Sequence, residues 1–67
     1  MSDMNDLEKG RIQGTVMAAA FLITQIDKPT MARDILRDAG IDIKDMRKAD
    51  VDNYDFKPVE KLLLNQD

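Results

Sequence analysis

The sequence predicts an all-α fold, a small bundle of about four helices around a central apolar N-terminal helix. Stretches in which apolar and polar residues alternate, the pattern of a half-buried strand, are scarce among the 67 residues. Apolar residues instead recur at intervals of three and four, which is the spacing of one helix face. Pro29, Gly40 and Pro58 separate these apolar segments where helices are expected to begin and end.

The first helix is expected within residues 7–26. Its inward face is predicted from apolar residues that share one side of a helix, namely Ile12, Val16, Ala19, Ala20, Ile23 and Ile26. Inside a helix, Gly10 and Gly14 would each cost about 1 kcal/mol relative to alanine. A start near Thr15 is therefore the alternative to a start near Leu7.

A second helix is expected after the turn formed by Asp27, Lys28 and Pro29, and it runs to about Asp38. Asp27 is the predicted N-cap, because proline is tolerated in the first turn that follows. Its inward face is predicted to consist of Ala32, Ile35, Leu36 and Ala39. Gly40 suits the left-handed conformation that often ends a helix.

A short third helix is expected after Asp42, with Asp45 three residues later completing an approximate capping box. Ile43 and Met46 give this helix a minimal apolar stripe. The acidic segment 50–55 is predicted to be a turn.

The last helix is expected to begin near Pro58, with Asp55 as its cap. Its inward residues are predicted to be Val59, Leu62 and Leu63. No repeat or linker divides the chain, so residues 1–67 are expected to form one domain, with residues 1–6 frayed.

The composition argues against several functional classes. The chain has 13 acidic and 10 basic residues, a formal charge of −3, and neither cysteine nor histidine. A disulfide scaffold, a zinc module and a histidine- or cysteine-based catalyst therefore lack their side chains. The hydroxyls of Ser2, Thr15, Thr24, Thr30 and Tyr54 have no recognisable base beside them, and there is no glycine-rich phosphate loop. We expect no enzyme, no cofactor, no metal and no small-molecule substrate.

Size and hydropathy suggest how such a chain is stabilised and where it resides. A domain of roughly 60 residues buries only about 60% of the surface of its unfolded chain, so binding a partner or a second copy is a natural way to add stability.

The longest apolar stretch, residues 16–23, is far shorter than the roughly 20 residues of a membrane span. No signal peptide is recognisable, and we expect a cytoplasmic protein that does not contact membranes.

The middle of the first helix suggests a contact surface. Eight consecutive apolar residues cover every side of a helix, and such a helix must be surrounded on all sides. Opposite the inward stripe lies a second one, which is the predicted partner-binding face and consists of Gly10, Gly14, Met17, Ala18 and Phe21. We expect a small protein-interaction or regulatory module that acts as a homodimer or binds a protein partner. In the alternative arrangement, Met17 and Phe21 pack under the C-terminal helix.

The segment around Gly40 raises a second hypothesis, a helix-turn-helix regulator that binds DNA. Its candidate nucleic-acid-binding residues are Arg33, Arg37, Lys44, Arg47 and Lys48. The chemistry is unfavourable, because Asp42 and Asp45 open the would-be recognition helix and would face phosphates. Residues 27–48 hold six basic and five acidic side chains, so their net positive charge is small for a surface that binds duplex DNA. We therefore disfavour this function.

The acidic turn raises the question of a calcium site. An EF-hand loop starting at Asp50 would need an oxygen ligand at Tyr54, glycine at Asp55 and glutamate at Lys61. All three requirements fail, so the turn is expected to be solvated.

Overall fold

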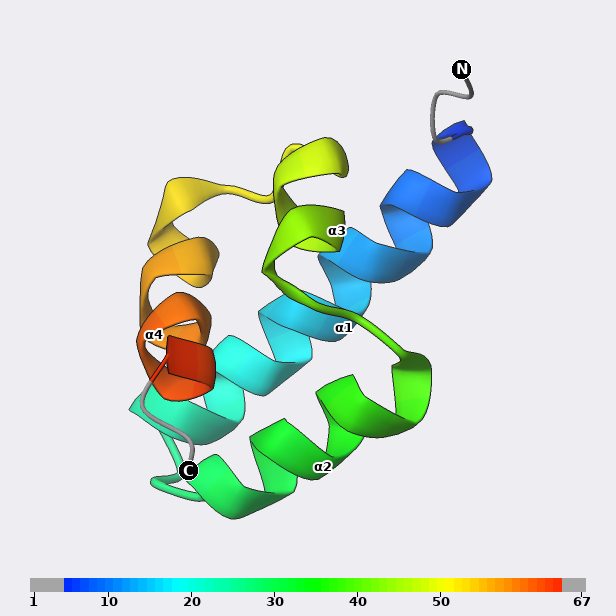
Figure 1. The fold of residues 1–67 in the computed structure, drawn as a ribbon. Coiled ribbons are helices and arrows are strands. Elements are labelled where there is room, and N and C mark those ends of the chain that lie inside the picture. Colours follow the sequence, from blue (N-terminus) through cyan, green and yellow to red (C-terminus); the bar gives the residue numbers. More distant parts are fainter. Residues whose placement is uncertain (1–4, 65–67) are drawn as a thin grey trace.

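The computed structural model describes residues 5–64, which form four helices and no strand (Figure 1). These helices are α1 (Asp6–Thr24), α2 (Pro29–Ala39), α3 (Ile43–Lys48) and α4 (Asn53–Leu64). α1 is the central element and contacts each of the other three helices. The prediction of a small all-α bundle with a central N-terminal helix is confirmed. The first turns of α1 project beyond the rest of the bundle (Figure 1).

Each helix contributes one fully buried, bulky side chain to a common core: Val16 from α1, Leu36 from α2, Met46 from α3 and Val59 from α4. The remaining buried residues are Ile12, Ala19, Ala20, Ala32, Ile41 and Ala49. All buried residues within 5–64 are apolar. The Gln13 side chain donates a hydrogen bond of 2.6 Å to the Ala49 carbonyl and so ties α1 to the end of α3.

α1 begins at Asp6, so the alternative start near Thr15 is wrong. The Asn5 side chain caps it by accepting a hydrogen bond of 2.8 Å from the Glu8 N–H, which satisfies one of the free donors of the first turn. Gly10 and Gly14 therefore lie inside the helix. Of the residues expected to fray, 1–4 lie outside the described part of the chain, whereas the next two form the cap and the first residue of α1.

Two predicted core positions of the α1 segment differ from the structure. Ile23 is only half-buried, although it packs against the core. Ile26 is 45% exposed, because the helix already ends at Thr24 and the chain then turns away. In α2, Ile35 is also exposed, since it lies at the edge of the face that Ala32 and Leu36 bury.

The turn between α1 and α2 corrects the predicted cap. Lys28, not Asp27, is the N-cap of α2, and its side chain makes no capping bond. Asp27 instead adopts a left-handed conformation with φ of 59°, which aspartate tolerates better than most residues. This turn is closed by a 2.7 Å hydrogen bond from the Lys28 N–H to the Leu22 carbonyl. Pro29 is the first residue of α2, as expected.

The end of α2 and the start of α3 agree with the sequence prediction. Gly40 ends α2 with φ of 69°, and the Ile41 N–H donates to the Leu36 carbonyl at 3.0 Å, as in a Schellman motif. The capping box of α3 is present, because Asp42 and Asp45 each accept a hydrogen bond from the backbone N–H of the other.

The start of α4 is the largest difference from the prediction. α4 begins at Asn53, not near Pro58, so Pro58 lies inside it and residues 53–55 belong to the helix rather than to a turn. Asp52, not Asp55, receives a hydrogen bond at this end, from the Tyr54 N–H at 3.1 Å. A proline here forfeits one backbone hydrogen bond, while the earlier start brings Phe56 against the core.

Candidate functional site

The outward side of α1 is lined by residues spaced alternately three and four apart, the repeat of a helix–helix seam. We call this set the outer seam. It consists of Leu7, Gly10, Gly14, Met17, Phe21 and Thr24. All six residues are exposed in the isolated chain, and Leu7, on the projecting turns, is 85% exposed. Ala18, also exposed, lies beside the seam, so all five predicted partner-binding residues are on this side of α1.

The two glycines of the outer seam have no role in the packing of the single chain. A Cβ atom built on Gly10 or Gly14 meets nothing within 4 Å, and neither residue has a positive φ. Each nevertheless costs the helix about 1 kcal/mol relative to alanine. Within the bundle the absence of a side chain therefore gives no visible benefit. Glycine on a helix surface does allow a second backbone to approach closely.

Met17 and Phe21 border a groove of about 470 Å³ between α1 and α4. From α4, Tyr54 and Pro58 line its other side. Met17 and Phe21 are 57% and 54% exposed, so they are not buried under the C-terminal helix as the alternative arrangement required. Tyr54 is 82% exposed and extends the apolar surface beyond α1.

From Gly14 to Thr24 the outer seam is nearly free of charge, whereas charged residues flank Leu7 and Gly10. From Ile12 to Gln25 the chain has no acidic or basic residue. Among the residues that line the groove, Asp55 is the only acidic or basic one. An uncharged, partly apolar surface on a chain with a formal charge of −3 is the kind of patch that protein contacts use.

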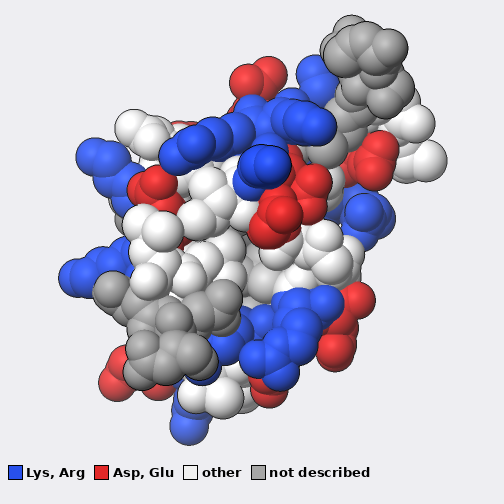
Figure 2. All heavy atoms as spheres, in the orientation of Figure 1, with Lys and Arg blue, Asp and Glu red and all other residues white. Residues whose placement is uncertain are grey.

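The five candidate nucleic-acid-binding residues do not form one cluster. Arg33, Arg37 and Lys44 line a different hollow, of about 370 Å³, between α2, the α2–α3 connection and α4. Arg47 instead lies 3.5 Å from the Glu60 carboxylate and over the ring of Phe56. Lys48 is exposed at the end of α3. On the face drawn in Figure 2, basic side chains gather over α3 and separately over α2, with acidic and uncharged surface between them.

The α2–α3 pair gives little support to a recognition helix. α3 has only six residues, and its N-terminal end, which would approach the bases, bears the capping carboxylates. The backbone N–H of Asp45 holds the pKa of the Asp42 carboxyl below its ordinary value, with a smaller contribution from the Asp45 side chain. This carboxyl therefore stays negative where phosphates would have to approach.

Other candidate chemistry is sparse in residues 5–64. The Thr15 and Thr24 hydroxyls donate to the carbonyls of Arg11 and Ala20, one turn earlier in α1. Within these residues, no three His, Cys, Asp or Glu side chains are grouped so as to hold a metal ion. None of the helices described combines the length and the apolar character needed to cross a bilayer.

Sequence reasoning did not find three contributors to this surface. Leu7 and Thr24 extend the outer seam by one position at each end, and the alternating spacing of three and four was the signal for them. Tyr54 lies in the segment predicted to be a turn, and only the early start of α4 places it beside the groove.

Comparison of the chain with protein-family models, with curated proteins and with solved structures finds no match.

Proposed function

We propose that this chain is a small non-enzymatic protein-interaction module that acts as a homodimer through the outer seam of α1. The observation that supports this proposal most is the pair of exposed helical glycines, Gly10 and Gly14, which destabilise the helix and relieve no contact within the chain. Close approach of a second helix would give both glycines a role.

The distribution of large and small side chains along the seam favours a second copy as the occupant. The N-terminal half of the seam has Gly10 and Gly14, and the C-terminal half has Met17 and Phe21. If two α1 helices pack antiparallel about a twofold axis, Phe21 lies against the partner's Gly10, and Met17 lies against the partner's Gly14. Each large side chain then meets a position without one, on both sides of the axis.

The same arrangement gives the projecting end of α1 a place to pack. Leu7 would lie near the partner's Thr24, at the groove that Phe21 and Tyr54 border. A contact of standard size buries about 800 Å² per partner, roughly a sixth of the 4790 Å² surface of this chain. α1 together with the exposed side of α4 offers a continuous surface for such a contact.

Sedimentation equilibrium of the full chain and of Phe21→Asp tests the proposal. The unmodified chain should show the mass of a dimer at micromolar concentration. Burying the exposed half of Phe21, about 100 Å², contributes about 2.5 kcal/mol by area in each copy and about 5 kcal/mol in a symmetric dimer, so its loss should weaken association by about a thousandfold or more. A buried unpaired carboxylate adds to the effect. Circular dichroism should show that the variant keeps its helices.

Met31→Asp is the matched control, because Met31 is 52% exposed but lies on α2, away from the seam. It should leave the dimer intact. Val16→Asp, at a fully buried position, should instead unfold the chain. A monomeric mass for the unmodified chain up to high micromolar concentration would contradict the proposal, as would equal dissociation by Met31→Asp.

A further inference from the structure

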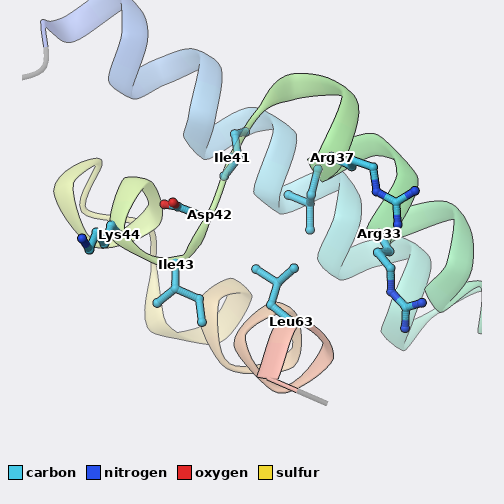
Figure 3. A pocket seen from close by; sticks show the side chains of 8 residues that line it. Arg33, Arg37, Ile41, Asp42, Ile43, Lys44 and Leu63 are labelled. Atoms are coloured by element: carbon cyan, nitrogen blue, oxygen red, sulfur yellow. The ribbon is translucent and has the colours of Figure 1, made fainter. Parts of the chain in front are cut away.

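The second hollow of the molecule combines an apolar floor with two arginines on one side (Figure 3). Its aliphatic lining comes from three parts of the fold: Leu36 from α2, Ile41 and Ile43 around the start of α3, and Leu63 from α4. Figure 3 shows Leu63 pointing into the hollow, with Arg33 and Arg37 beside it on α2. This hollow shares no lining residue with the groove between α1 and α4.

The charges around this hollow are not balanced within the described part of the chain. Neither Arg33 nor Arg37 forms an ion pair there, and the Nε of Arg33 is shielded from solvent without an acceptor among residues 5–64. A shielded donor without a partner is unusual in a folded protein. The carboxylate of Asp42, which also lines the hollow, accepts a hydrogen bond from the Asp45 N–H in the α3 cap. Lys44 points away from the hollow (Figure 3).

We propose that this hollow binds an acidic peptide segment of a partner protein, one in which carboxylates flank an aliphatic side chain. Arg33 and Arg37 are four residues apart on α2, so their side chains leave the helix about 5–6 Å apart. Glutamates four residues apart on a partner helix have the same spacing, and each can form a charge-assisted pair with one guanidinium. An aliphatic side chain between them would cover the half-buried Ile43 and Leu63.

The apolar floor favours a peptide over a nucleic acid. Phosphates would pair with the arginines but would leave the aliphatic lining uncovered, whereas an acidic peptide complements both parts of the hollow. The hollow is also open to solvent, so a small carboxylate would stay largely exposed in it. A peptide gains further contacts on the surrounding surface. This inference does not depend on the outer seam, so monomeric Phe21→Asp should bind the same peptide.

Fluorescence anisotropy with the full chain and synthetic alanine-based helical peptides tests the inference. The first probe has glutamates four residues apart with leucine between them. The second has glutamine in place of glutamate, and the third has alanine in place of leucine. The first peptide should bind at least about tenfold more tightly than either of the others, because both the ion pairs and the apolar contact contribute.

Arg33→Gln with Arg37→Gln should weaken binding of the first peptide by at least about tenfold. Arg33→Lys with Arg37→Lys should lose less affinity for this peptide than the glutamine variant, since lysine keeps the charge but not the paired geometry of the guanidinium. The matched control, Lys48→Gln with Lys57→Gln, removes the same charge from exposed positions outside the hollow and should change binding less than about twofold. Thermal melts should show that all three double variants fold.

Three results would overturn the inference. One is the absence of binding by the first peptide at millimolar concentration. Another is an equal loss in the Lys48 and Lys57 control, which would indicate nonspecific charge attraction. The third is tighter, salt-sensitive binding of duplex DNA that Arg47→Ala with Lys48→Ala also weakens, which would assign these basic residues to a nucleic acid.

Discussion

Replacing Gly10 and Gly14 by alanine separates the stability of the fold from the strength of association. Both positions lie inside α1, where alanine is favoured over glycine by about 1 kcal/mol each. The added Cβ atoms meet nothing within 4 Å in the single chain, so no steric penalty offsets this gain. The double variant should therefore stabilise the monomer by about 2 kcal/mol. In a domain of this size that raises the melting temperature of the monomer by about 8–16 °C.

The same substitutions should weaken the dimer. If Phe21 and Met17 of one copy pack on the partner's Gly10 and the partner's Gly14, new methyl groups push the two helices apart. Overpacking of this kind typically costs about 1–3 kcal/mol, so the dissociation constant should rise by about tenfold or more. Melts monitored by circular dichroism on diluted protein, with sedimentation equilibrium on concentrated protein, measure the two effects separately. A double variant that is more stable and still associates as tightly as the parent chain would refute the assignment of these glycines to the interface.

Three further substitutions test how the fold is held. Gly40→Ala should destabilise the chain by about 1–2 kcal/mol in thermal melts, the opposite sign to the other two glycines, because φ of 69° strains any residue with a Cβ. Asp42→Ala should cost about 1 kcal/mol near neutral pH by removing the cap. The pKa of Asp42 is lowered in the folded chain, so the cap stabilises the fold fully above the pKa that Asp42 has in the unfolded chain. This stabilisation is lost as the pH falls through the pKa that Asp42 has in the folded chain. Thermal melts of the parent chain should therefore lose this increment in acid, whereas melts of the Asp42→Ala variant should not. Met46→Ala should cost about 2–5 kcal/mol in denaturant unfolding, because the side chain is fully buried where α3 meets the core, and a loss below about 1 kcal/mol would contradict this packing.

Local rules predicted much of the fold. The capping box at Asp42 and the left-handed Gly40 depend on residues within one turn, so the sequence contains all the information they need. The spacing of Ile12, Val16 and Ala19 likewise identified the buried side of α1, because helix geometry fixes which residues share a face.

Errors arose where tertiary packing outweighs a local preference. Pro58 suggests a helix start, yet α4 begins five residues earlier, where Phe56 gains contact with the core. Ile26 fits the helical spacing but lies beyond the last turn, because Asp27 takes a left-handed turn that local rules did not predict.

The two candidate surfaces differ in how far the sequence predicts them. All five predicted partner-binding residues are exposed on one side of α1, since a run of apolar residues around a helix necessarily leaves one side facing outward in a bundle this small. The hollow beside Arg33 and Arg37 depends on Leu63, which approaches α2 only through the packing of α4. Helical periodicity alone does not place residues from separate helices together.

Disulfide cross-linking between two single-cysteine variants tests antiparallel self-association most directly, because the natural chain has no cysteine to compete. Gly14→Cys and Met17→Cys are prepared separately and oxidised alone and as a mixture. An antiparallel pair brings position 14 of one copy near position 17 of the other, within the Cα separation of about 4.4–6.8 Å that a disulfide spans. The account predicts a cross-linked dimer of one Gly14→Cys and one Met17→Cys chain in the mixture, and little product from either variant alone. Efficient cross-linking of each variant with itself would indicate parallel packing, and no cross-linking in any sample would contradict association through this seam.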